Sequence, residues 1–249
     1  MNASLQCMSN IIELTKFFLD TNLNTINDKD KTLSFAYQEV IENLWPKNNN
    51  YLIKKSYAPY NFKKIISKMN PLFKGIQAND SKDLILFLLE TIHSELNKKQ
   101  NINSNINQNI PQNPGYTIYD FNTAFKLYTN EFMKNFNSII SDLFFGAECS
   151  STKCFSCNAI SYNVQSYNLL IFPLEKVRLF KGYNRNQSLT LADCFECRRY
   201  PEYFSDDNQI FCNNCQRNSQ ACNWSFLVYG PNVLIINLNR GKENKYDVN

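Results

Sequence analysis

The chain has 249 residues, of which 43% are hydrophobic and 19% charged, a composition typical of one large or two small globular domains. Its net charge of +4 is spread along the chain, so we do not expect a nucleic-acid-binding protein with clustered basic residues. No apolar run approaches the roughly 18 residues of a membrane span, and charged residues interrupt the first twenty positions, which excludes a secretory signal. We therefore expect a soluble protein of the cytoplasm or nucleus, without membrane contact.

Residues 1–136 are predicted to be helical. A stripe of residues recurs every three or four positions at the start of the chain (Leu5, Met8, Ile12, Thr15 and Leu19), and an i+4 row of leucine and isoleucine runs from Leu84 to Leu96. Both are predicted to face the core. Weaker helical patterns cover 31–44, 61–69 and 118–134. Residues 97–114 form a polar, Asn-rich stretch with almost nothing to bury, so we expect a disordered insertion there.

Residues 137–249 are predicted to be mainly β-structure. Apolar and polar residues alternate at 162–168 and 224–228, which is typical of strands, and one helical segment is expected at 189–197. The continuous apolar run Val233–Ile236 predicts a strand buried on both faces. A helical half followed by a β half predicts an α+β fold.

Nine cysteines and a single histidine mark the chain. Six of the cysteines form three C-x-x-C pairs, and reduced thiols with this spacing favour metal binding over a disulfide framework. Two of these pairs lie in turn-like contexts and predict one structural zinc site of four thiolates. The predicted ligands are Cys154, Cys157, Cys212 and Cys215.

The third pair, Cys194 and Cys197, lies in the helical segment among apolar residues and is interpreted as packing, with a metal role as the alternative. The isolated Cys7 falls inside the first helix and is also expected to be packed. His93 lies on the long helical row, where a packing role is expected.

Further motifs lie outside the two C-x-x-C pairs of the predicted zinc site. They are the segments Met1–Gln6, Asp80–Leu84, Leu88–Leu96, Phe144–Gly146, Leu191–Phe195 and Pro231–Arg240. Taken in order together with the two C-x-x-C pairs, these segments resemble the ubiquitin-specific protease family of papain-like cysteine peptidases. The resemblance covers nearly the whole chain and implies a helical thumb followed by β fingers and a partial palm, an isopeptidase activity that cleaves after the C-terminal Gly of ubiquitin, and ubiquitin as partner.

The same resemblance places the nucleophilic Cys two residues before Met1 and the general-base His after Asn249. We therefore expect a chain truncated at both ends, with no catalytic residue of its own and no hydrolytic activity as given. A first helix without a capping residue agrees with this interpretation.

Asp80 corresponds to the family's Asp that meets the basic tail of ubiquitin, whereas the neighbouring residues Ala78, Asn79, Asp83 and Leu84 depart from the family's pattern. From its position before the long helix, Asp80 is also expected to be an N-cap. Two alternatives to a protease domain stay open: a non-catalytic ubiquitin-binding pseudo-protease and, in third place, a zinc-ribbon nucleic-acid module.

Overall fold

The structure, a computed structural model, describes residues 1–23, 32–46, 57–77, 80–98, 117–184 and 187–240. The predicted disordered insertion at 97–114 lies almost entirely outside these residues. Chain contacts divide the protein into two compact units. The helical unit comprises described residues within 1–100 and 136–143, and the sheet unit comprises those within 101–135 and 144–249.

The helical unit is built around buried apolar side chains. Its largest fully buried side chains include Phe18, Tyr37, Phe62 and Phe73, with Phe18 and Phe62 both packed against the ring of Tyr37. The expected helices at 31–44 and 61–69 and the long apolar row are all confirmed. The elements are α1 (Asn2–Ser9), α2 (Ile12–Asp20), α3 (Thr32–Leu44), α4 (Tyr60–Met69), the short 3₁₀ helix η2 (Pro71–Phe73), α5 (Ser81–Leu96) and most of α7 (Ile139–Phe144).

The stripe predicted from Leu5 to Leu19 is divided between two helices. The helix is interrupted at Asn10 and Ile11. This interruption changes the direction of the side chains of α2 relative to those of α1. As a result Ile12, predicted to be in the core, is 62% exposed, while Leu5 and Thr15 are buried as expected. The Thr15 hydroxyl donates to the Ser9 carbonyl (2.7 Å) across the break.

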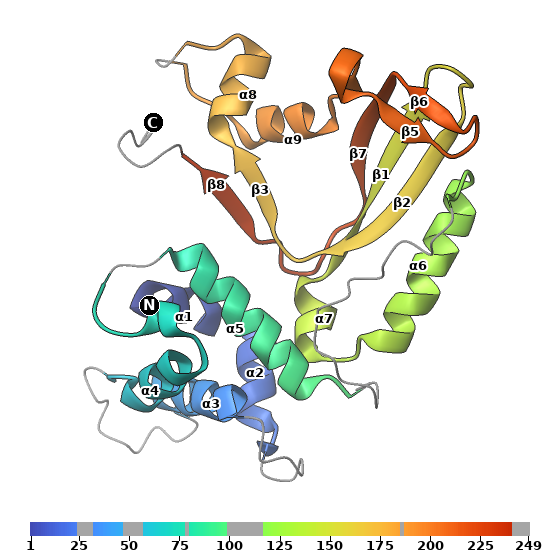
Figure 1. Cartoon of the computed structure of the whole chain (residues 1–249). Coiled ribbons are helices and arrows are strands. Elements are labelled where there is room, and N and C mark those ends of the chain that lie inside the picture. Colours follow the sequence, from blue (N-terminus) through green and yellow to red (C-terminus); the bar gives the residue numbers. More distant parts are fainter. Residues whose placement is uncertain (24–31, 47–56, 78–79, 99–116, 185–186, 241–249) are drawn as a thin grey trace. The chain divides into compact units, whose positions relative to one another are not determined.

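The sheet unit contains a four-stranded antiparallel sheet with the order β2-β1-β7-β4. A two-stranded parallel sheet (β3-β8) and a small antiparallel hairpin (β5-β6) complete its strands (Figure 1). The strands are β1 (Gly146–Cys154), β2 (Ile160–Tyr167), β3 (Leu170–Pro173), β4 (Glu202–Phe204), β5 (Ile210–Cys212), β6 (Arg217–Ser219), β7 (Ala221–Tyr229) and β8 (Ile236–Asn239). The predicted α+β class is confirmed.

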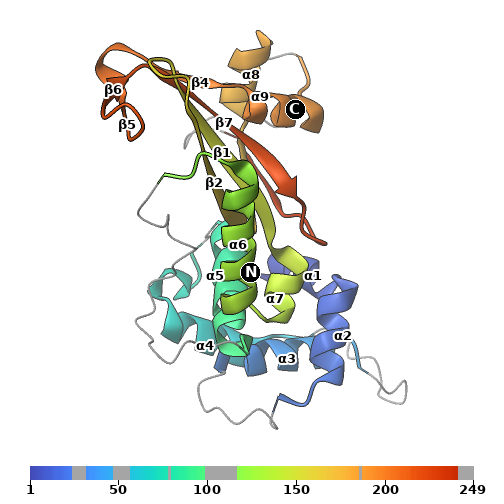
Figure 2. The ribbon, with the colours of Figure 1, turned by 90° about the vertical axis from the view of Figure 1, so that its right-hand side faces the viewer.

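Helix α6 (Phe121–Asn135) runs beside β2 and belongs to the sheet unit (Figure 1 and Figure 2). Its aromatic side chains Phe121, Phe125 and Tyr128 pack on Cys149 and Val164 of the sheet. The boundary between the two compact units therefore differs from the boundary predicted at residue 136. The reason is that the apolar face of α6 is buried against strands.

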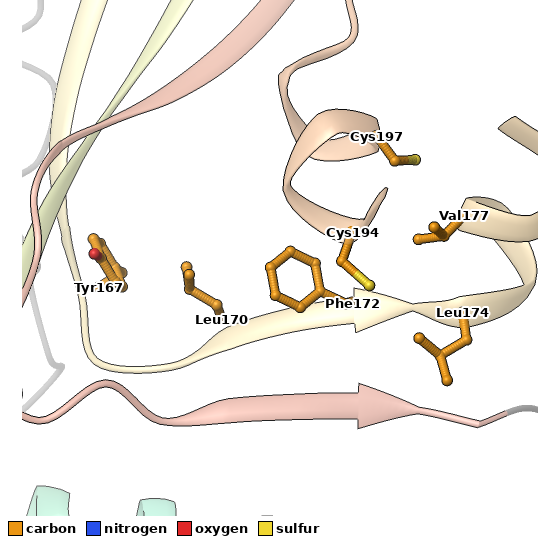
Figure 3. Close-up of a cluster of buried hydrophobic side chains, with 7 residues drawn as sticks. All are labelled: Tyr167, Leu170, Phe172, Leu174, Val177, Cys194 and Cys197. Carbon is orange, nitrogen blue, oxygen red and sulfur yellow. The ribbon is translucent and has the colours of Figure 1, made fainter. Parts of the chain in front are cut away.

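A second cluster in the sheet unit joins β3 to α8 (Leu174–Lys181) and α9 (Leu191–Arg199). Cys194 and Cys197 of α9 belong to the same buried cluster as Phe172, Leu174 and Val177 (Figure 3). The packing interpretation of this C-x-x-C pair is thereby supported. Burial raises the pKa of both thiols, as an apolar environment does.

The run Val233–Ile236 is not the doubly buried strand that the sequence predicts. Strand β8 begins only at Ile236, and its residues are half-buried or exposed. Among the described residues β8 pairs with β3 alone. No helix in the described part of the chain is long and apolar enough to cross a membrane.

Candidate functional site

Four cysteine sulfurs meet where the β1–β2 connection approaches the β5–β6 hairpin. Cys154 ends β1, Cys157 follows in the turn, Cys212 ends β5 and Cys215 lies in the next turn. All four sulfurs lie within 4.8 Å of one another, and two of the sulfur–sulfur distances are 3.9 Å (Cys154–Cys215) and 3.7 Å (Cys157–Cys212). The sequence-predicted set is therefore brought together in space, although 54 residues (158–211) separate its two halves in the sequence.

Both halves of the cluster are tight turns held by backbone hydrogen bonds. The Cys154 amide donates to the Ala159 carbonyl (3.0 Å), and the Gln216 amide donates to the Cys212 carbonyl (2.8 Å). Asn158 and Gln216 adopt positive φ angles of 58° and 54°, which lets the chain reverse within a few residues. Each turn thus aims two sulfurs at one point.

Polar side chains surround the sulfurs. The Cys154 sulfur lies within hydrogen-bond distance of the Ser219 hydroxyl (3.2 Å), and the Asn214 amide donates to the Cys157 sulfur (3.4 Å). Burial opposes ionisation of Cys154, but its hydrogen bonds with Ser219 and with nearby backbone amides outweigh burial and lower its pKa to about 6. The Asn214 hydrogen bond lowers the pKa of Cys157. These partners favour the thiolate form of Cys154 and Cys157, the form of cysteine that binds metal. Burial and the hydrogen bond with the Cys212 sulfur instead raise the pKa of Cys215 to about 11.

The geometry of the cluster fits one metal ion of zinc size. Four sulfurs at about 2.3 Å from a central ion in a tetrahedron lie about 3.8 Å from each other, close to the two sulfur–sulfur distances in the cluster. Four protein ligands fill the coordination sphere, so such an ion would cross-link the two turns and leave no position for a substrate. The cluster can therefore hold a metal in a structural role.

Ser219 is a site residue that sequence reasoning missed. It lies 65 positions after Cys154 and belongs to no cysteine motif, so only the pairing of β5 with β6 brings its buried hydroxyl to the cluster. A serine in a short polar strand carries no signal of this role in the sequence.

Asp80 begins α5 as the sequence predicts. Its carboxylate accepts a hydrogen bond from the Lys82 amide (2.8 Å), so its role as N-cap is confirmed. Asp83 lies 3.5 Å from the Lys82 ammonium group in an ion pair. Asp80 also lines an open cavity of about 690 Å³ in the helical unit, together with Met1, Tyr60, Phe73, Ile76 and other residues.

His93 is part of the helical core and packs on Phe136, with its ring nitrogen 2.6 Å from the Ser138 hydroxyl. Burial lowers its pKa to about 4, so it is neutral at physiological pH. Two positions later Glu95 accepts hydrogen bonds from the amides of Leu33 and Ser34 at the start of α3. The His-x-Glu segment is therefore structural, as expected for His93, while the capping role of Glu95 was not foreseen.

The expectation that Cys7 is packed is wrong. Cys7 is exposed on α1. Leu5 and Met8 lie on the buried face of this helix, and Cys7 lies on its solvent-exposed face. Arg198 forms an ion pair with Glu148 of β1. Cys149 and Cys222 are buried in strands.

The arrangement of helices and antiparallel sheet is similar to the fold of solved structures. The solved structure described as the SAGA Ubp8/Sgf11/Sus1/Sgf73 DUB module bound to ubiquitin aldehyde aligns with 96% of this chain and 44% of that chain, with a TM-score of 0.65 and 16% sequence identity. The same module bound to monoubiquitin aligns over 96% of this chain with a TM-score of 0.63.

The family model for ubiquitin carboxyl-terminal hydrolases matches residues 1–249, and the chain belongs to this family. Ubiquitin carboxyl-terminal hydrolase 4 of Saccharomyces cerevisiae is 25% identical over 246 residues, which cover 96% of this chain and 26% of that protein. Ubiquitin carboxyl-terminal hydrolase 32 of Homo sapiens is 30% identical over 181 residues, or 70% of this chain and 10% of that protein. The chain thus spans about a quarter of the first of these relatives.

Proposed function

We propose that this chain forms the thumb, fingers and part of the palm of a cysteine-type deubiquitinase that hydrolyses isopeptide bonds after the C-terminal Gly of ubiquitin. The observation that carries the proposal is the family match over all 249 residues, in which helices, sheet and cysteine turns follow one another in the family's order. We place its activity in the cytoplasm or nucleus, where thiols stay reduced.

The 249 residues alone are proposed to be inactive. A thiol protease needs a histidine within hydrogen-bond reach of the attacking cysteine. The single histidine of the chain, His93, is half-buried, neutral and engaged with Ser138, and Cys7, on the surface of α1, is not among its described contacts. We expect no release of fluorophore from a C-terminal ubiquitin conjugate, and turnover that disappears on Cys7→Ala would contradict this proposal.

We propose zinc as the occupant of the cysteine cluster. Four sulfur ligands at tetrahedral separations suit Zn²⁺, and a closed coordination sphere suits a structural ion. Elemental analysis of the purified chain should give about one zinc per chain. A zinc content far below this, after purification without chelators, would refute the site.

Asp80 is proposed to contact the basic tail of ubiquitin in addition to capping α5. The support is its position in the family motif and at the rim of an open cavity in the helical unit. The two roles can be separated because asparagine caps a helix about as well as aspartate but carries no charge.

The corresponding test uses isotope-labelled ubiquitin titrated with Asp80→Asn, with Asp83→Asn as a matched control that removes a charge one turn away. Asp80→Asn should reduce chemical-shift changes in the basic tail of ubiquitin while thermal stability is kept, and Asp83→Asn should leave the changes intact. Equal binding by the wild-type and Asp80→Asn chains would assign Asp80 to capping alone. Absence of ubiquitin binding by the zinc-loaded chain would exclude the alternative of a ubiquitin-binding pseudo-protease.

A further inference from the structure

The residues just before α6 lie beside the cysteine cluster. Asn213, which lies between the ligands Cys212 and Cys215, donates from its side-chain amide to the Thr117 hydroxyl at 2.5 Å. The Thr117 hydroxyl also hydrogen-bonds with Tyr119. One side chain of the second cysteine turn therefore reaches a segment 96 positions earlier in the sequence.

The same segment is attached to the outer edge of the four-stranded sheet. The Tyr162 amide of β2 donates to the Ile118 carbonyl at 2.9 Å. Strand β2 is the last strand of the sheet on this side, so this bond uses an amide that no neighbouring strand of the described sheet takes. Two residues later Asp120 accepts hydrogen bonds from the Thr123 amide and hydroxyl, both at 2.7 Å, at the start of α6.

The position of Asn213 depends on the turn that carries it. Metal ligation by Cys212 and Cys215 would hold both ends of this turn, and the Gln216 side chain closes it by donating to the Asn213 carbonyl (2.6 Å). Without an ion the turn keeps only its hydrogen bonds, since β5 and β6 are three residues long each and half of their side chains are exposed. The Asn213 side chain would then lose its fixed direction.

We propose that the metal site has a second structural role, because through Asn213 and Thr117 it holds residues 117–120 on the edge of β2 and so fixes the start of α6. This inference rests on the proposed zinc site. It makes Asn213 and Thr117 positioning residues, distinct from the ligands and from Asn214, which contacts the Cys157 sulfur.

Amide hydrogen exchange of the 249-residue chain, followed by NMR, tests the inference at the Tyr162 amide. In zinc-loaded Asn213→Ala and in zinc-loaded Thr117→Val we expect this amide to exchange about tenfold faster, the effect of losing a hydrogen bond of ordinary strength. The Ser161 and Asn163 amides point to the opposite edge of β2, toward β1, so their exchange rates should change little. Asn218→Ala is the matched control and should leave Tyr162 protected, because Asn218 is an exposed residue of β6 outside the cysteine turns.

Zinc content is measured on every sample, which separates failure of the inference from failure of the site. If zinc is bound and Tyr162 stays protected in both Asn213→Ala and Thr117→Val, the link is absent although the metal site stands. If all β2 amides lose protection equally, the effect is general loosening and the inference is also wrong. If the wild-type chain binds no zinc, both the proposed site and the link that depends on it are refuted.

Discussion

The helical unit and the tip of the sheet unit are stabilised in different ways. In the helical unit large apolar side chains such as Phe18, Phe62 and Leu88 are almost completely buried. At the tip the β5–β6 hairpin is short, and Phe211 of β5 is exposed. The buried residues of β5 and β6 are Cys212 and Ser219, so the cysteine cluster occupies the place of an apolar core in this hairpin.

This contrast shows how a small β-hairpin can be ordered without a hydrophobic core of its own. Burial of apolar surface acts over many residues, whereas a metal ion concentrates stabilisation in four ligands. Substitutions in the helical unit should therefore lower its stability by graded amounts. A substitution of any one ligand in the cysteine cluster should instead remove the whole contribution of the metal to the stability of the β5–β6 hairpin.

The largest expected effect is loss of the metal. Cys215→Ser should bring the zinc content from about one per chain to near zero and remove amide protection from the β5–β6 hairpin, because the zinc sites of small peptides contribute on the order of 10 kcal/mol to folding. Amides of α3 and α5 should keep their protection.

The matched control for this prediction is Cys7→Ser. Cys7 is exposed on α1 and belongs to no described metal cluster, so its replacement should change neither zinc content nor hairpin protection. Equal loss of protection in α5 after Cys215→Ser would contradict the separation of the two units.

A core substitution in the helical unit should have an intermediate effect. Leu88→Ala removes a side chain that is 1% exposed and should lower the free energy of unfolding by about 3 kcal/mol in urea denaturation. Zinc content should stay unchanged. Ile12→Ala is the control from the surface of the same unit and should cost well under about 1 kcal/mol.

His93 makes the stability of the helical unit depend on pH. Its folded pKa of about 4 lies below the ordinary value of 6.5, so the unfolded chain binds the proton more readily and stability falls as the pH drops from 6.5 toward 4. This residue should account for a loss of about 2 kcal/mol between pH 7 and pH 5.

The measurement is urea denaturation at both pH values for the wild-type chain and for His93→Gln, which cannot gain a proton in this range. The pH dependence should be smaller in the variant by this amount. The same pH dependence in both chains would show that other groups are responsible.

How much could be read from the sequence also differs between the two regions. The row from Leu84 to Leu96 predicted α5 because helical periodicity is local, and the C-x-x-C spacing predicted the ligand set because two sulfurs per turn are local as well. The boundary between the units could not be read in this way. The sequence shows that helix α6 has an apolar face. Only long-range packing decides whether strands or helices cover that face.

The same reasoning explains the individual errors. Ile12 fits the spacing of the first stripe, but a two-residue break shifts the phase of the second helix. The apolar run at Val233 was expected to be a strand buried on both faces, but burial depends on the elements that cover a strand and not on its own residues alone. Ser219, Asn213 and Thr117 are ordinary polar residues whose roles arise only from contacts distant in sequence.

The smallest expected effect concerns the ion pairs that connect helices to strands in the sheet unit. Arg198 of α9 pairs with Glu148 of β1, and their side chains are 25% and 13% exposed. Lys176 of α8 pairs with Glu202 of β4 at 59% and 60% exposure. A double-mutant cycle with Arg198→Met and Glu148→Gln should give a coupling energy of about 1 kcal/mol, because solvent screens this pair only in part. The same cycle with Lys176→Met and Glu202→Gln should give a coupling close to zero, and equal couplings for the two pairs would show that burial does not decide their strength.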